Sequence, residues 1–265
     1  MNRMPALFIG HGSPMNTLES NQYTRTWEAL GKNLPRPKAI LCISAHWFIG
    51  STVVTAMPDP RTIHDFYGFP QALFDYEYPA SGAPDLAKRI AELIKPDWIG
   101  LDQDQWGLDH GTWSILAHMF PEADIPVVQL SINAMKPFDY HVRIGRALAP
   151  LRDEGVLILG SGNVVHNLRL IQWRRPEYGE DWAVDFDQAV IDQIAADPGK
   201  LGQVASHPGF SRAVPTPDHF LPLAYIAGVA TEGEGTAKAF LQSYTMGSLS
   251  MTCFQVGDGP RVNQT

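Results

Sequence analysis

The chain has 265 residues, of which 45% are hydrophobic and 18% are charged, and this composition excludes an intrinsically disordered protein. Its 28 acidic residues outnumber its 20 basic residues and give a formal net charge of −8, which argues against binding to nucleic acid or to an anionic membrane. Two cysteines, Cys42 and Cys253, cannot form a disulfide scaffold, and both lie in apolar segments. Because no apolar run reaches membrane-spanning length and no signal sequence is recognised, we expect a cytoplasmic protein.

Short apolar runs alternate with segments of helical periodicity along the chain. The runs are nearly continuous rather than alternating in polarity, as expected for strands buried between two layers of helices. In 85–94, by contrast, Leu86, Ile90 and Leu93 recur at the spacing of one helix face. In chain order, the sequence predicts strands at 6–10, 39–44 and 52–57, a helix at 85–94, a strand at 127–132, a helix at 140–148, a strand at 156–160, helices at 182–196 and 221–229, and a strand at 251–256.

This order of elements predicts an α/β fold. We expect a single layered domain, residues 1–265, with a central, largely parallel or mixed sheet flanked by helices. Two stretches, 58–84 and 174–181, are expected to form long surface loops, and no repeat or linker divides the sequence.

Histidine placement is the most informative feature of the sequence, which contains nine of them. His11, His46 and His166 each follow a predicted strand. Because the carboxyl ends of parallel strands meet at one edge of a sheet, where α/β proteins bind ligands, we expect these imidazoles to lie close together. Imidazole binds zinc, iron, copper and nickel, so a histidine-rich metal site is the simplest hypothesis and leaves the metal open.

A further histidine, His219, lies in the motif PTPDH just before the predicted helix 221–229. Thr216 or Asp218 is expected to cap this helix, and the helix N-terminus would keep the imidazole neutral and able to bind a metal. Other catalytic patterns are absent from the sequence: it contains no GxSxG elbow, no HExxH motif and no paired-cysteine zinc motif.

Two aromatic-rich segments suggest a substrate pocket. His110 stands between Asp109 and Trp113, an arrangement that suits a polar group held in an aromatic-lined pocket. The segment 64–70, HDFYGFP, is consistent with a lid over an aromatic substrate and equally with an ordinary surface loop. Three other histidines have no supporting neighbours and are interpreted as ordinary helix or loop residues: His118, His141 and His207.

Seven motifs then occur in order along the chain. They are GHGSPM (10–15), SAHW (44–47), HDFYGFP (64–70), DHGTWS (109–114), SGNVVHNL (161–168), PTPDHFLPL (215–223) and MGSLSM (246–251). Together they resemble the class III extradiol ring-cleavage dioxygenases, and more closely the single-chain 4,5-DOPA extradiol dioxygenase branch of the LigB-type superfamily. The resemblance runs from about residue 5 to residue 256 and so covers nearly the whole chain.

The resemblance implies roles for individual histidines. His11, His46 and His219 are implied as ligands of one divalent metal per chain. His166 is implied as a fourth ligand or as the catalytic base, and His110 as a substrate-contacting or proton-shuttling residue. Many extradiol enzymes use two histidines and one carboxylate, whereas the third position here is His219, as in the DOPA-type branch.

The implied activity is non-haem, metal-dependent extradiol cleavage in aromatic compound metabolism. Dioxygen would be inserted next to the diol of DOPA or another substituted catechol to give a ring-opened semialdehyde. Fe(II) is the metal expected for activity, and Zn(II) is expected to bind the same imidazoles without redox chemistry. Two alternatives stay open: a zinc-dependent hydrolase using the same histidines, and a non-catalytic metal-binding protein on the same fold. The expected partners are a small catechol and O₂, without nucleic acid or membrane, and no oligomeric state is indicated.

Overall fold

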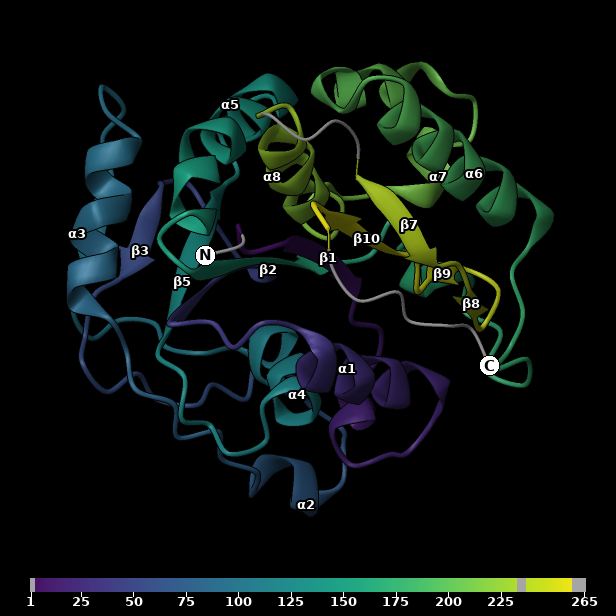
Figure 1. The fold of residues 1–265 in the computed structure, drawn as a ribbon. Helices are drawn as coiled ribbons and strands as arrows, with labels where there is room; N and C mark the ends of the chain where they lie inside the picture. The colour runs from purple at the N-terminus through teal and green to yellow at the C-terminus, as the bar shows by residue number, and fades with distance from the viewer. Residues whose placement is uncertain (1–2, 233–236, 259–265) are drawn as a thin grey trace.

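An eight-stranded β-sheet runs through the centre of the structure, a computed structural model that describes residues 3–232 and 237–258 (Figure 1). The spatial order of the strands is β4-β3-β5-β2-β6-β1-β10-β7, and the central strands β5, β2, β6 and β1 are parallel. On either side of them, β3 and β10 pair in the antiparallel direction. The strands of this sheet are β1 (Ala6–Gly10), β2 (Ala39–Ile49), β3 (Val53–Thr55), β4 (Gly100–Asp102), β5 (Val127–Asn133), β6 (Val156–Gly162), β7 (Lys238–Leu241) and β10 (Cys253–Val256), and a separate pair consists of β8 (Tyr244–Thr245) and β9 (Leu249–Ser250).

Helices cover both faces of the sheet, with α1 and α4 on one side and α5 and α8 on the other (Figure 1). The helices are α1 (Gln22–Asn33), α2 (Gln71–Phe74), α3 (Pro84–Leu93), α4 (His110–Met119), α5 (Phe138–Leu148), α6 (Asp181–Ala196), α7 (Phe210–Ala213) and α8 (Leu221–Ala230). Short 3₁₀ turns are η1 (Pro14–Thr17), η2 (Ala149–Arg152), η3 (Leu168–Leu170) and η4 (Pro198–Ser206). The predicted α/β class, with a largely parallel or mixed sheet between helices, is confirmed.

Each face of the sheet has its own hydrophobic core. Along β1, Phe8 packs into the cluster that contains Leu223 of α8, whereas Leu7 and Ile9 pack into the cluster that contains Trp27 of α1. All five side chains are fully buried, and each aliphatic one stabilises the fold by about 1.5–3 kcal/mol. Burial on both faces explains why the strands appear in the sequence as continuous apolar runs.

The predicted strand 39–44 is too short. In the structure β2 continues to Ile49, so His46 lies inside a strand rather than after it. The pairing of β2 with β5 shifts register between Ile43 and Phe48. The backbone therefore stays extended beyond the point where polar residues interrupt the apolar run, and hydrophobicity alone does not reveal this extension.

Helix α1 was not predicted from the sequence. Its apolar stripe consists mainly of Tyr23, Trp27 and Leu30, which is a weak periodic signal. The start of the helix does carry a capping signal, because the Asn21 side chain accepts hydrogen bonds from the backbone N–H groups of Tyr23 and Thr24. The expected loop 58–84 also contains a short helix, α2.

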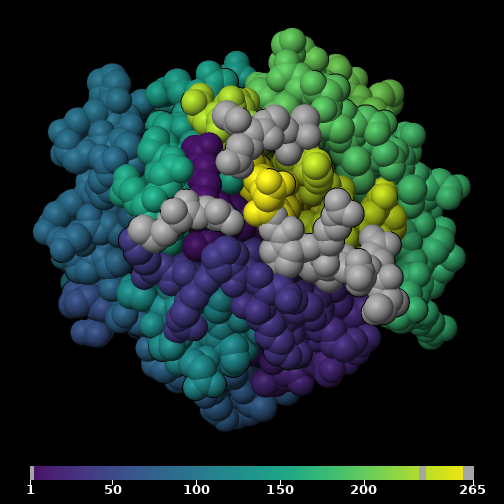
Figure 2. Space-filling model, viewed as in Figure 1, coloured from purple at the N-terminus to yellow at the C-terminus, as the bar shows by residue number. Residues whose placement is uncertain are grey.

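The space-filling view from the same side shows the layers packed into a rounded body, with α1 below the sheet and α6 at the upper right (Figure 2). Among the described residues, no helix is both long and apolar enough to cross a membrane. The fully buried α8 has 10 residues, whereas a membrane span needs about 20.

Candidate metal centre

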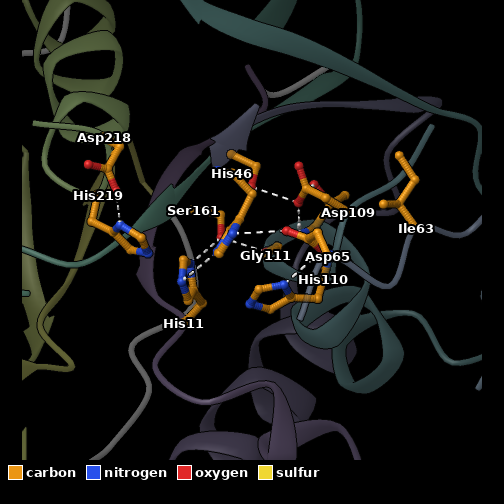
Figure 3. Close-up of polar contacts among 12 residues, drawn as sticks. His11, His46, Ile63, Asp65, Asp109, His110, Gly111, Ser161, Asp218 and His219 are labelled. Carbon is orange, nitrogen blue, oxygen red and sulfur yellow. Dashed lines mark hydrogen bonds and ion pairs between the residues drawn. The ribbon is translucent and has the colours of Figure 1, made fainter. Parts of the chain in front are cut away.

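Four histidines from distant parts of the sequence converge where the parallel strands end (Figure 3). His11 follows β1 directly and His46 lies near the end of β2, while His110 begins α4. His219 lies two residues before α8. The ring centroids of His11, His46 and His219 are 5.1–5.2 Å apart, and the His110 ring lies 3.9 Å from that of His46.

Two glycines allow the chain to come this close. Gly12 turns the backbone with a φ of +63°, and a Cβ placed there would lie 2.6 Å from the Met251 sulfur. At Gly111, in the first turn of α4, a Cβ would lie 2.5 Å from Ser44 Oγ and 2.9 Å from the His46 ring. Any larger residue at either position would therefore displace the walls of the site.

The hydrogen bonds of Ser161 assign the proton on His11. Ser161 Oγ donates to the carbonyl oxygen of Gly111 at 2.5 Å, so its oxygen accepts from His11 Nδ1 at 2.9 Å. The His11 ring therefore carries its proton on Nδ1. Its Nε2 is left with a lone pair that points into the site, which is the arrangement of a metal-binding imidazole.

One carboxylate, Asp65, orients two further imidazoles. Its Oδ2 accepts from His46 Nδ1 at 2.9 Å, and its Oδ1 accepts from His110 Nδ1 at 2.8 Å and from the His110 backbone N–H at 3.0 Å. Burial opposes ionisation of Asp65, but the hydrogen bonds from His110 and His46 outweigh it and hold the pKa of this carboxyl below its usual value. Both imidazoles thereby carry a proton on Nδ1, and in the neutral form of each ring the lone pair lies on Nε2.

The resulting geometry fits a cation. His46 Nε2 lies 3.3 Å from His11 Nε2, and the His11 atom carries a lone pair because the His11 proton is on Nδ1. That lone pair accepts either a proton held on His46 Nε2 or a bond to a cation placed beside both rings. One ring nitrogen each of His11, His46 and His110 also lie within 4.8 Å of one another, a spacing that can hold a metal ion. The donor set therefore fits the metal that the sequence predicts.

His219 and His166 form the opposite wall. His219 Nδ1 is hydrogen-bonded to Asp218 Oδ2, which leaves its Nε2 free to face the other imidazoles. The His166 ring stacks on it with centroids 3.5 Å apart and an interplanar angle of 3°. Asp218 therefore orients His219. The prediction that Thr216 or Asp218 caps α8 is wrong, because the N-cap of that helix is Phe220 and no side chain forms a capping hydrogen bond there.

Burial sets the charge state of most of these histidines. It is the main cause that lowers the pKa of four imidazoles below the usual value: His11, His110, His166 and His219. For His46 burial acts in the same direction, but the hydrogen bond to Asp65 and the nearby carboxylate charges outweigh it and raise the pKa. Because the pKa is lowered in four of these imidazoles and raised only in His46, the cluster as a whole resists protonation. Its neutral rings therefore keep lone pairs that can bind a cation.

The segment 64–70 divides into an inner and an outer part. The Phe66 ring packs edge-on against His110 with centroids 5.5 Å apart, so this part covers the site. Tyr67 is 91% exposed and contributes nothing to the wall. His64 Nε2 bonds to the backbone oxygen of Tyr76 at 2.8 Å and lies outside the histidine cluster.

Three residues that orient the histidines were missed by the sequence analysis: Asp65, Ser161 and Asp218. Each lies inside one of the seven motifs, and Asp218 even precedes a predicted ligand. Two of these residues, however, contact a histidine that lies far away in the sequence. Asp65 is separated from His110 by 45 residues, and Ser161 from His11 by 150. Only the fold brings Asp65 and Ser161 to their partners.

Comparison with known proteins identifies the class of this molecule. Over residues 5–254 the chain matches the family described as the catalytic LigB subunit of aromatic ring-opening dioxygenase, and it belongs to that family. A 4,5-DOPA dioxygenase extradiol from Escherichia coli K12 is 50% identical, over 96% of this chain and 95% of its own length. A protein of the same name from Beta vulgaris is 38% identical, over 87% of this chain and 88% of its own length. The solved structure of an uncharacterized protein from Escherichia coli K12 has a TM-score of 0.83 and 45% identity, and covers 96% of this chain and 100% of that chain.

These likenesses confirm the family and the enzyme class predicted from the motifs, an aromatic ring-opening dioxygenase of the extradiol type. The site agrees with metal binding, because three imidazole nitrogens lie within the reach of one ion. No observation on the described residues favours the hydrolase or the non-catalytic alternative.

Proposed function

We propose that this enzyme inserts both atoms of O₂ into a catechol next to its diol and releases a ring-opened semialdehyde. The observation that carries the proposal is the convergence of one ring nitrogen each of His11, His46 and His110 within 4.8 Å of one another. Family membership supplies the reaction class, and the relatives named for 4,5-DOPA make DOPA or a catechol with a related side chain the proposed substrate.

The proposed metal ligands are His11, His46 and His219, with one divalent metal per chain. His166 is proposed as a fourth ligand or as the base, and its stacking on His219 supports a place beside the metal. His110 is proposed to contact the substrate, although its ring nitrogen also lies within ligand distance of His11 and His46. When bound, Fe(II) supplies the redox chemistry that activates O₂, which Zn(II) lacks.

The protein's own part in the reaction is proton transfer and orientation. A catechol hydroxyl must lose a proton, and a neutral imidazole with a free nitrogen can accept it. Burial keeps the pKa of His166 and His110 low, so both rings are neutral at pH 7. Asp65 holds the Nδ1 proton of His110, which leaves Nε2 as the atom that can accept a hydrogen bond or a proton from the substrate. Phe66 packs edge-on against this ring and limits its rotation.

The test is to load the purified protein with Fe(II) under anaerobic conditions and then supply O₂ with a panel of catechols. We expect O₂ consumption in equal amount to substrate and a yellow semialdehyde product. Zinc-loaded protein should bind catechol without consuming O₂. The variant His207→Asn, at an imidazole outside the site, serves as the control and should keep wild-type turnover.

Two results would reject the proposal. If zinc-loaded protein cleaved an ester or amide without O₂ while Fe(II)-loaded protein consumed none with any catechol, the enzyme would be a hydrolase. If neither metal supported turnover although metal binding was stoichiometric, the chain would be a binding protein.

A further inference from the structure

A cavity of about 400 Å³ opens beside the histidine cluster. Ser13 lies in its wall only two residues after His11, and two residues of extended chain span at most about 7 Å. Asn16, also in the wall, donates from Nδ2 to the backbone oxygen of His11 at 2.9 Å. Met251 completes the inner wall, and its sulfur packs against Gly12. The floor of the cavity is thus the turn that carries a proposed metal ligand.

The cavity also adjoins the His110 side of the site through the segment 64–70. Phe69 lines the cavity, and its ring contacts Phe66 with centroids 5.4 Å apart. Phe66 in turn packs on His110. The cavity therefore borders the histidine cluster through the turn at His11 and through the pair Phe66 and Phe69, although no described histidine is part of its lining. Its volume lies in the range of small-molecule pockets.

The lining is aromatic and acidic. Tyr23, Phe69 and Trp173 present rings, and Trp173 is 77% exposed. Among the described residues that line the cavity, Glu19 and Glu177 carry the only formal charges. Burial raises the pKa of the Tyr23 phenol and the charge of Glu177 raises it further, which agrees with a carboxylate close to this ring.

No described basic side chain in the lining of the cavity neutralises the negative charges of Glu19 and Glu177. Arg174 and Arg175 follow Trp173 in the chain, but neither is part of the cavity wall. The Arg175 guanidinium lies 3.1 Å from the centre of the Tyr178 ring, and its Nη1 donates to Gln172 Oε1 at 3.4 Å.

We propose that this cavity binds the side chain of the substrate and selects a catechol whose side chain bears an ammonium group over one that bears only a carboxylate. Carboxylates attract an ammonium ion and repel a carboxylate, and exposed aromatic faces add cation–π attraction. The inference rests on the proposed function, since it places the diol at the histidine cluster and the amine in the cavity.

Turnover kinetics test the selection directly. The substrates are dopamine, 3-(3,4-dihydroxyphenyl)propionate as the acidic counterpart, and 4-ethylcatechol as the uncharged reference. Because both glutamates are exposed, we expect a preference in kcat/KM of about 3- to 10-fold for the amine over the uncharged catechol, and a lower value for the acid. The double variant Glu19→Gln/Glu177→Gln should remove the preference, so that the kcat/KM values of the amine and the acid fall within about twofold of that of 4-ethylcatechol.

The matched control is Glu122→Gln, which removes an exposed carboxylate from a different cavity between α1 and α4. It should keep the wild-type preference. If the double variant keeps it too, or if the wild-type enzyme prefers the acid, the inference is wrong although the proposed function stands.

A binding measurement without turnover separates the two ideas. Tyramine, which lacks the diol, and 3-(4-hydroxyphenyl)propionate are titrated into metal-free protein while tryptophan fluorescence is followed, with Trp173→Phe identifying the signal of Trp173. We expect tyramine to bind more tightly than the acid and the double glutamine variant to lose this difference. Such binding in a protein that turns over no catechol would reject the proposed function alone, whereas equal binding of the two phenols would overturn the inference.

Discussion

Two buried histidine environments in this protein differ in what surrounds the ring. In the metal centre, the Nδ1 atoms of His11 and His46 donate to Ser161 and Asp65, and their Nε2 atoms face each other. His141 is also fully buried, but it lies between α5 and α8, where its Nδ1 is 3.0 Å from the Tyr225 hydroxyl. Burial is the main cause that lowers the pKa in both His11 and His141.

A low pKa and a buried ring therefore do not distinguish a metal ligand from a core residue. The difference lies in the partners. At the metal centre, an acceptor on Nδ1 fixes the tautomer and several lone pairs converge on one point. At His141, the contact with Tyr225 joins two helices of one layer. Among the described ring contacts, the His141 ring touches only tyrosines and no other imidazole.

The largest expected effect separates the proposed ligands from their neighbour His110. We expect His219→Ala to weaken metal binding at least ~100-fold, because losing a ligand should cost more than losing a residue that only orients one. We expect His110→Ala to retain one metal per chain but lose turnover. Metal content after dialysis against a competing chelator measures both. If His110→Ala loses the metal and His219→Ala keeps it, the ligand set is His11, His46 and His110.

The carboxylate that orients two imidazoles gives the next effect. Asp65→Asn can accept from only one ring through its single oxygen, so one of His46 and His110 loses its fixed tautomer. We expect metal affinity or turnover to fall about 10- to 100-fold. The matched control is Asp187→Asn, a buried carboxylate that accepts from hydroxyls of Ser250 and Thr252.

The control variant should lower the free energy of unfolding but leave metal affinity per folded chain unchanged, because Asp187 has no imidazole partner among its described hydrogen bonds. Chelator competition and urea unfolding together make the distinction. Equal loss of metal affinity in the two variants would mean that Asp65 acts only by stabilising the fold.

A pH experiment examines His141, the buried histidine outside the metal centre. Burial lowers the pKa of His141 to about 4, below the 6.5 of an unfolded chain. Because the unfolded state then binds a proton that the folded state does not, stability falls as the pH drops from about 6.5 towards 4. We expect His141 to account for about 2 kcal/mol of lost stability between pH 7 and pH 5.

The measurement is urea unfolding of metal-free wild-type protein and His141→Gln at several pH values, so that titration of the cluster cancels in the difference. The stability difference between the two proteins should change by about 2 kcal/mol over this interval. Parallel curves for the two proteins would show that His141 does not titrate as its burial implies.

The fold was predictable where hydrophobicity coincides with secondary structure. Strand β1 has the predicted bounds because five buried residues end at a glycine turn. Prediction failed where tertiary context decides: β2 runs on past Ser44 through pairing with β5, and α1 is held by the few side chains that reach the core.

The candidate site was predictable in its residue types but not in its contacts. Histidines after strands had a geometric reason to meet, because parallel strands deliver their carboxyl ends to one edge. The sequence contains no comparable reason for Asp65 to bridge His46 and His110, or for His166 to stack on His219. Those relations depend on how loops close over the sheet, and periodicity carries no information about loop closure.

The smallest expected effect concerns the uncharged partner of His11. Ser161→Ala removes the acceptor on His11 Nδ1 but removes no charge, and a neutral hydrogen bond contributes about 1 kcal/mol, equal to a roughly fivefold change in affinity. Metal affinity should therefore fall less than in Asp65→Asn. Chelator competition with Ser161→Ala and Asp65→Asn, measured in parallel, shows which hydrogen-bond partner contributes more to metal affinity. A loss in Ser161→Ala as large as in Asp65→Asn would mean that fixing the tautomer, rather than the negative charge beside the ring, determines how strongly the imidazole binds the metal.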